Sequence, residues 1–196
     1  MRRSVDWTRP LVPSSGMEDI ELRKPTRITL RTGDASQAAK LHALISSNLE
    51  EGRLLPRDLG DLAAHAGRFV VAMRGRTMVG CADLAPLSPQ VAEVRSLAVD
   101  AKTRGSGIGA MLVEELRQRA RREGFEKLCA FTHRPGYFSQ MGFSIVPHLW
   151  LPEKIFTDCV KCPLFRQCGQ YAMLLPLDAP SSEAVDRDSV YAVRHV

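Results

Sequence analysis

Residues 91–109, VAEVRSLAVDAKTRGSGIG, join an alternating, valine-rich segment to a glycine-rich turn and the start of a helical pattern. The alternation over 91–99 predicts a β-strand, and the spacing of apolar residues from Gly107 onward predicts a helix. Glycines at 105, 107 and 109 let backbone N–H groups approach a ligand without side chains in the way. Because these groups lie where a helix begins, the turn favours an anion, and a pyrophosphate suits it.

A dinucleotide site is the first alternative, because Gly105-x-Gly107-x-x-Ala110 also matches the pattern G-x-G-x-x-G/A. That site needs its first glycine close behind the strand and an acidic residue roughly 20 positions later. Here residues 102–104, KTR, intervene, and the next predicted strand ends at 130–133, AFTH, without a carboxylate. A nicotinamide or flavin site is therefore disfavoured. A second alternative is that the loop needs its glycines only to make a tight turn and binds nothing. The two cations of the KTR segment favour anion binding over this alternative.

The composition is that of one ordinary globular domain, with 196 residues, of which 44% are hydrophobic and 25% charged. No run of 18 apolar residues occurs, and residues 1–16 lack the apolar stretch of a secretory signal, so no membrane span is expected. The five cysteines, an odd number, then favour reduced thiols in the cytoplasm, with an arginine-bearing organelle transit peptide as the weaker alternative.

The net charge of +5 suits an acidic small molecule and would also suit nucleic acid. However, four arginines near the middle of the chain alternate with glutamates on one predicted helix, and no aromatic residue accompanies them: Arg117, Arg119, Arg121 and Arg122. A solvated helix face explains this pattern better than a nucleic-acid surface, and no nucleic-acid partner is predicted.

The whole chain predicts a single α/β domain with a mixed, mostly antiparallel sheet flanked by helices. Residues 1–25, rich in proline, serine and arginine, are expected to form a flexible arm, 26–177 the domain and 178–196 a polar tail. The expected strands are 27–30, 69–73, 77–84, 91–99, 127–132, 143–147 and 171–175. The expected helices are 34–49, 58–65, 107–123 and 135–141.

The sequence Arg104-x-x-Gly107-x-Gly109 lies between a strand that ends LAVD, 97–100, and an amphipathic helix. In this setting it resembles the acetyl-CoA loop of the GNAT acetyltransferases. The resemblance implies a GNAT fold with acetyl-CoA as cosubstrate. It also implies that strand residues bind the thioester arm through their backbone and that the turn binds the pyrophosphate, which gives these candidates: Leu97, Ala98, Val99, Arg104, Gly105, Ser106, Gly107, Ile108 and Gly109.

Two further segments, AEVRSLAV at 92–99 and DCVKCPLF at 158–165, resemble the short, stand-alone N-acetylglutamate synthases. The resemblance covers about residues 27–177 and implies acetyl transfer to the α-amino group of L-glutamate, the first step of arginine synthesis. It implies that the substrate carboxylates bind to three arginines, since arginine can donate two parallel hydrogen bonds. These are Arg57, Arg95 and Arg134. The alternatives are another amine or protein acceptor, which would favour acidic residues, and a non-catalytic regulatory module that binds coenzyme A or metal.

Glu93 is the candidate general base, because the acceptor's ammonium must lose a proton and Glu93 matches the glutamate that the family carries on this strand. The alternative is a structural pair with Arg95, since residues two apart on a strand share a face.

Tyr137 is the candidate general acid for the leaving thiolate. The resemblance places a tyrosine four residues before the glycine of a Gly-Phe pair. Here the pair is Gly142-Phe143 and that position holds Phe138, one residue after Tyr137. His133 as the acid, or a thiolate that leaves without one, are the alternatives.

The segment 152–170 contains the pattern Cys159-x-x-Cys162-x5-Cys168. A structural zinc site needs four ligands, so His148, Asp158 or a partner chain would have to complete it. We favour small thiols packed in a C-terminal flap over zinc and over a redox pair, and no metal site is predicted. The oligomeric state stays open, with a homodimer as one option.

Overall fold

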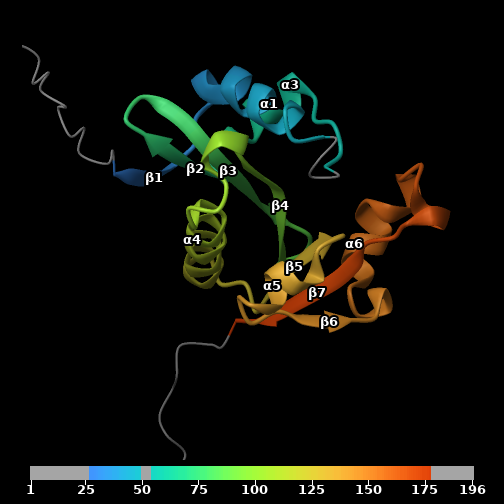
Figure 1. The fold of residues 1–196 in the computed structure, drawn as a ribbon. Coiled ribbons are helices and arrows are strands. Elements are labelled where there is room, and N and C mark those ends of the chain that lie inside the picture. The colour runs from blue at the N-terminus through green and yellow to red at the C-terminus, as the bar shows by residue number, and fades with distance from the viewer. Residues whose placement is uncertain (1–26, 50–53, 178–196) are drawn as a thin grey trace, which may run out of the picture.

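The computed structural model describes residues 27–49 and 54–177 (Figure 1). The expected arm, 1–25, and the expected tail, 178–196, therefore lie outside the described residues. In the part of the chain that is described, no helix has the length and apolar character needed to cross a membrane.

One seven-stranded sheet organises the fold, with its strands in the order β1-β2-β3-β4-β5-β7-β6. Neighbouring strands are antiparallel except β4 and β5, which are parallel. This confirms the predicted fold class. The insertion of the last strand between β5 and β6 was not predicted. The strands are β1 (Ile28–Thr32), β2 (Phe69–Arg74), β3 (Thr77–Pro86), β4 (Val91–Val99), β5 (Lys127–Thr132), β6 (Ser144–Val146) and β7 (Tyr171–Pro176).

Helices cover both faces of the sheet, so β2 and β3 are buried on both sides. Alternate residues of β2 point to opposite faces: Val70 belongs to the apolar core beneath α4, and Val71 to the core beneath α1 and α3. Figure 1 shows α4 on the opposite side of these strands from α1 and α3. The helices are α1 (Ala38–Ser46), α3 (Leu59–Ala64), α4 (Ile108–Arg122), α5 (Pro135–Ser139) and α6 (Pro152–Thr157).

Strand β4 changes character halfway along its length. Its first three residues, 91–93, pair with β5, and in the described chain no later residue of β4 does so. Ser96 has a positive φ of 49°, and the register with β3 shifts opposite it, between Cys81 and Asp83. This irregularity is a β-bulge, which bends a strand and increases its twist. As a result β4 and β5 separate toward the glycine-rich turn (Figure 1).

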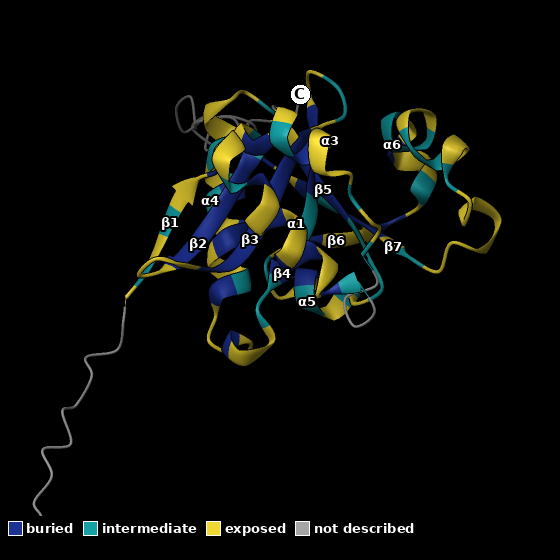
Figure 2. Cartoon of the chain, turned by 90° about the horizontal axis from the view of Figure 1, so that it is seen from above, coloured by how far each residue is buried: buried dark blue, intermediate teal, exposed yellow. Residues whose placement is uncertain are grey.

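Residues 148–170, which we call the flap, project from the sheet between β6 and β7 (Figure 2). Leu151 is fully buried and packs with Val91 and Cys129 in a small third core. No residue of α6 is buried, and Phe156 is 75% exposed. Apolar packing therefore fixes the start of the flap, and other contacts must hold α6.

Candidate active site

The turn between β4 and α4 has the backbone geometry of an anion-binding loop. Gly105 and Gly107 have φ values of 78° and 80°, in the left-handed region that favours glycine. A β-carbon added at either would meet no atom within 4 Å, so both face open space. Gly107 caps α4 without a side-chain hydrogen bond, which leaves the first N–H groups of the helix for a ligand.

Arg104 and Ser106 hold this turn from within the protein. The Arg104 Nε donates to the carbonyl of Val99 at 3.3 Å, and its Nη2 donates to Oδ1 of the buried Asn48 at 2.8 Å. The Ser106 hydroxyl donates to the carbonyl of Thr103 at 2.5 Å. Arg104 thus connects the turn to β4 and to the segment after α1. Its role as a phosphate ligand stays a prediction.

The structure brings all nine predicted acetyl-CoA-binding positions together, on the second half of β4 and the turn. The side chains of Leu97 and Val99 pack against the core beneath α4, and Ala98 is buried in the opposite core. On the β3 side, Ala98 and Val99 pair with Cys81 and Gly80. Their other edge faces the region where β5 has separated, so it suits an extended ligand with amide groups.

Tyr137, rather than Phe138, faces the turn. A β-carbon added at Gly109 would lie 2.4 Å from the Tyr137 hydroxyl oxygen, so this hydroxyl contacts the first turn of α4. Phe138 is buried and packs edge-to-face on Phe143, with 5.3 Å between ring centroids. Burial raises the pKa of Tyr137, which keeps its proton in place at neutral pH. The alternative acid, His133, lies next to Gly169 of the flap.

Glu93 is the centre of a buried ion network. It is 3% exposed, and its Oε2 accepts from Arg95 Nε at 2.5 Å. Lys154 of α6 donates from Nζ to both Glu93 oxygens at 2.8 Å and to Asp158 Oδ2 at 2.9 Å. Asp158 also accepts from Arg95 Nη2. These four residues, which we call the quartet, contain two cations and two carboxylates and connect α6 to β4.

The quartet contains the pair of Glu93 and Arg95 that was the alternative to a catalytic Glu93, and the pair does not stand alone. Burial opposes the charged form of Arg95, but Glu93 and Asp158 more than offset this effect and raise its pKa. The guanidinium therefore stays charged. The base role of Glu93 and the substrate role of Arg95 stay predictions.

Arg57 belongs to a second ion network on the other side of the bulge. Its Nη2 donates to Asp61 at 2.6 Å, its Nη1 donates to Oγ of Ser96 at 3.1 Å, and the same Nη1 lies 3.5 Å from Asp83. Asp83 is fully buried and accepts two hydrogen bonds from Arg68 at 3.2 Å. Arg57 is thus placed close to Arg95 in the fold: it donates to the neighbouring Ser96, and Asp83, which lies 3.5 Å from Arg57, pairs in register with Arg95.

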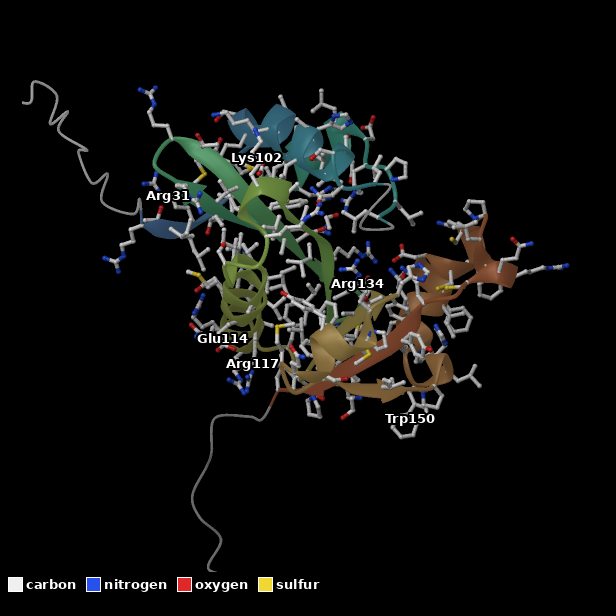
Figure 3. The ribbon with its side chains drawn as sticks, in the orientation of Figure 1. Arg31, Lys102, Glu114, Arg117, Arg134 and Trp150 are labelled. Atoms are coloured by element: carbon white, nitrogen blue, oxygen red, sulfur yellow. The ribbon has the colours of Figure 1, made fainter. Side chains whose placement is uncertain are left out.

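Arg134, the third predicted carboxylate ligand, caps α5 at the end of β5. Its side chain is exposed, and Figure 3 shows it between β4 and α6 in that view. Residues 50–53, which precede Arg57 by a few positions, lie outside the described residues.

The cysteines of the flap do not form a metal centre within the described chain. Over residues 27–49 and 54–177, no group of three or more histidine, cysteine, aspartate or glutamate side chains is placed to hold a metal ion. Cys159 and Cys162 are partly buried, and Cys168 is exposed. A turn closes between the first two, where the N–H of Cys162 donates to the carbonyl of Cys159 at 3.0 Å.

Two cavities lie along α4. One, of about 340 Å³, is lined by residues of α4 and of the segment that follows α5, including Ala110, Arg117 and Gln140. Arg117 and Glu114 project from α4 there (Figure 3). The other, of about 410 Å³, lies between β1 and the C-terminal half of α4, away from the predicted chemistry.

Sequence reasoning did not place four of the charged residues at this site, although it considered Asp158 as a zinc ligand: Asp61, Asp83, Lys154 and Asp158. Lys154 is a lone lysine in a short segment without clear period, and its partner Glu93 lies 61 positions earlier. No local pattern marks such a residue. The carboxylates that neutralise Arg57 were likewise hidden among ordinary surface-type charges.

The fold and the loop together define a class of protein, and comparison with known families gives the same class. Residues 37–143 match the acetyltransferase (GNAT) family, and the chain belongs to that family. An uncharacterised N-acetyltransferase, CT2212, of Chlorobaculum tepidum is 30% identical over 148 residues, which are 76% of this chain and 96% of that protein. Membership confirms the expected N-acetyl transfer and acetyl-CoA as cosubstrate.

More distant similarities point to amino-acid acetyltransferases. One from Pasteurella multocida is 29% identical over 64% of this chain, but this chain spans only 29% of that protein's length. The N-acetylglutamate synthase of Neisseria gonorrhoeae, solved with coenzyme A and N-acetyl-glutamate, has a TM-score of 0.70 at 24% identity. The match covers 79% of this chain and 36% of that one. Rv2747 from Mycobacterium tuberculosis, solved with CoA and NLQ, has a TM-score of 0.66 at 24% identity. This match covers 76% of this chain and 99% of that one. These structural likenesses show the fold.

The residues present fit acetyl-CoA on structural grounds of their own. The turn offers two open left-handed glycines and uncapped helix N–H groups, and β4 offers an unpaired edge where β5 departs. Both features suit the pyrophosphate and the amide-containing arm of the cosubstrate.

Proposed function

We propose that this chain transfers the acetyl group of acetyl-CoA to the α-amino group of an acidic amino acid, with L-glutamate as the first candidate. The observation that carries the proposal is that two arginines are placed at the bulge of β4. Arg95 lies on the strand, and Arg57 donates to the hydroxyl of the neighbouring Ser96 at 3.1 Å. Arginine pairs well with carboxylates, so an acceptor with two carboxylates suits this site better than a polyamine does.

The relatives support the same acceptor class. The similar proteins of P. multocida and Escherichia coli are amino-acid acetyltransferases, and the N. gonorrhoeae structure contains N-acetyl-glutamate. The E. coli enzyme is 30% identical over 53% of this chain, which spans 24% of its length.

The residues of the site supply each step of a direct transfer. The acceptor's ammonium gives a proton to Glu93, and the free amine attacks the acetyl carbon, so that a C–N bond forms and the C–S bond breaks. The nitrogen, positively charged after the attack, loses its second proton to water and becomes the neutral amide. Donors at the turn end of β4 hold the thioester still while its oxygen gains charge. Tyr137, whose hydroxyl is protonated at neutral pH, gives a proton to the departing thiolate.

The ion network sets a condition on this mechanism. Both oxygens of Glu93 accept hydrogen bonds from Arg95 or Lys154 in this structure. Two cations that donate to Glu93 favour its charged form, so Glu93 takes a proton more readily when one of them transfers its hydrogen bond to another anion. An acceptor that brings its own carboxylate provides one.

The test is to measure thiol release from acetyl-CoA with each of the common amino acids and with a polyamine, followed by mass detection of the product. We expect glutamate or aspartate to be acetylated and the polyamine to be inert. Acetylation of the polyamine or of a protein terminus alone would overturn the acceptor class and leave the family intact.

A second measurement tests the base. Glu93→Gln should lower turnover more at low pH than at high pH, where the acceptor amine is already free, while the exposed Glu123→Gln should match the wild type at every pH. A loss that is equal across pH would make Glu93 a structural partner of Arg95.

A further inference from the structure

The Lys154 ammonium has an unusual position for a lysine of a short, exposed helix. Its side chain is only 14% exposed, and Nζ lies between the carboxylates of Glu93 and Asp158. The same ammonium lies 5.3 Å from the centre of the Phe131 ring on β5, within the range of a cation–π contact. Lys154 thus brings a second cation from the flap to the predicted base.

The two carboxylates that share this ammonium differ in their access to water. The Glu93 side chain is 4% exposed and lies on β4, which the sheet holds in place. The Asp158 side chain is 36% exposed and lies just after α6, where no residue is buried. Asp158 can therefore exchange its partners for water at modest cost, whereas Glu93 cannot.

Asp158 also shows that Arg95 and Lys154 together form a carboxylate site. A single oxygen of Asp158 accepts from Arg95 Nη2 and from Lys154 Nζ. Its carboxylate, which is not part of the sheet, occupies the place that the carboxylate of a small molecule would take on the same two cations.

The charge balance of the quartet indicates what that molecule carries. With two cations and two carboxylates the quartet is neutral. If Asp158 leaves and nothing replaces it, two cations and one carboxylate remain in a largely buried place, which is unfavourable. A carboxylate of the acceptor that takes the place of Asp158 restores neutrality.

We propose that Lys154 is an acceptor-binding residue: with Arg95 it binds a carboxylate of the amino-acid acceptor, which displaces Asp158, while the acceptor's amine faces Glu93. This inference rests on the proposed function and extends it. It assigns the flap a part in choosing the substrate, and it makes Asp158 an internal competitor of the acceptor.

The competition predicts opposite effects for two substitutions that break the same ion pair. Lys154→Met should raise KM for L-glutamate about 10- to 100-fold, the range for a lost hydrogen bond to a charged group, without changing KM for acetyl-CoA. Lys154→Arg should restore much of the loss. Asp158→Asn should instead lower KM for glutamate, because it removes the competing carboxylate and keeps both cations.

A merely structural role for Lys154 predicts another pattern, in which both substitutions loosen α6 and raise KM together. That result would overturn the inference and leave the proposed function standing. If Lys154→Met does not fold by circular dichroism, the direction of the Asp158→Asn effect decides alone. If the wild type acetylates no carboxylate-bearing acceptor, the proposed function fails at that point and this inference fails with it.

Discussion

The contact between Gly109 and Tyr137 allows the predicted general acid, Tyr137, to be displaced by a substitution at another residue. In Gly109→Ala the new β-carbon would lie 2.4 Å from the tyrosine hydroxyl oxygen. Unstrained contacts between heavy atoms need about 3.5 Å, so the hydroxyl must move by roughly 1 Å. The hydroxyl is at the end of a flexible side chain, and alanine is favoured over glycine in a helix by about 0.5–1 kcal/mol, so the free energy of unfolding should change by less than about 1 kcal/mol.

Activity should respond much more than stability does. A misplacement of about 1 Å at a reacting group can cost about 100-fold, and we expect kcat of Gly109→Ala to fall by that order. Tyr137→Phe should show a similar loss, and the double variant should lose little more, because the two changes remove one function. The assay is thiol release under saturating acetyl-CoA, with urea unfolding for stability.

The matched control is Gly67→Ala, where an added β-carbon meets no atom within 4 Å and kcat should stay at the wild-type value. Wild-type kcat in Gly109→Ala would refute the reasoning, as would losses in the two single variants that add in the double one. A raised KM for acetyl-CoA with normal kcat would place the effect in the turn instead of at the tyrosine.

Three other predictions concern charge and burial. Asp83→Asn should lower the free energy of unfolding in urea by about 3–5 kcal/mol, because it leaves Arg68 and the buried side of Arg57 without a carboxylate; a change below about 1 kcal/mol would contradict the burial of this network. The hydrogen bond from Arg57 holds the pKa of Asp61 below its usual value. The charged Asp61 carboxylate therefore stabilises the fold above the unfolded pKa of about 3.9, and this stabilisation is lost as pH falls through the lower folded pKa. The urea midpoints of wild type and Asp61→Asn should therefore differ at pH 6 and converge near pH 2, and a difference that does not depend on pH would count against it. Burial raises the pKa of Cys81 to about 12, so an alkylating reagent at pH 8 should modify the exposed Cys168 first and reach Cys81 only after unfolding, as mass analysis of peptides would show.

The parts of the fold that sequence predicted are those whose signals are local. The glycines at 105 and 107 adopt the positive φ values that make glycine necessary, and the alternation over 91–99 matches β4 within one residue at each end. The order of β6 and β7 in the sheet was not predictable in the same way. Strand pairing between segments far apart depends on how whole faces pack, and one strand of three residues carries little pattern.

The same distinction between local signals and distant contacts applies to the candidate site. The shift of the tyrosine by one position, from 138 to 137, left the acid open in the sequence, and only the direction of the two rings in the structure distinguishes them. Lys154 and Asp158 could not be found, because an ion pair across 61 or 63 positions leaves no periodic trace. Arg57 was found through resemblance, yet its carboxylate partners were not, since nothing in their neighbourhood distinguishes them from surface charges.

The early end of pairing between β4 and β5 gives this sheet an edge in its interior. Edges at the rim of a sheet expose unpaired N–H and C=O groups to other proteins and invite aggregation. Here the unpaired edge is flanked by elements of the same domain, so a second protein strand with its neighbours has no room to add. The bulge at Ser96 thus opens the sheet beside β4. We expect the extended, amide-containing arm of acetyl-CoA, and not a protein strand, to pair with this edge.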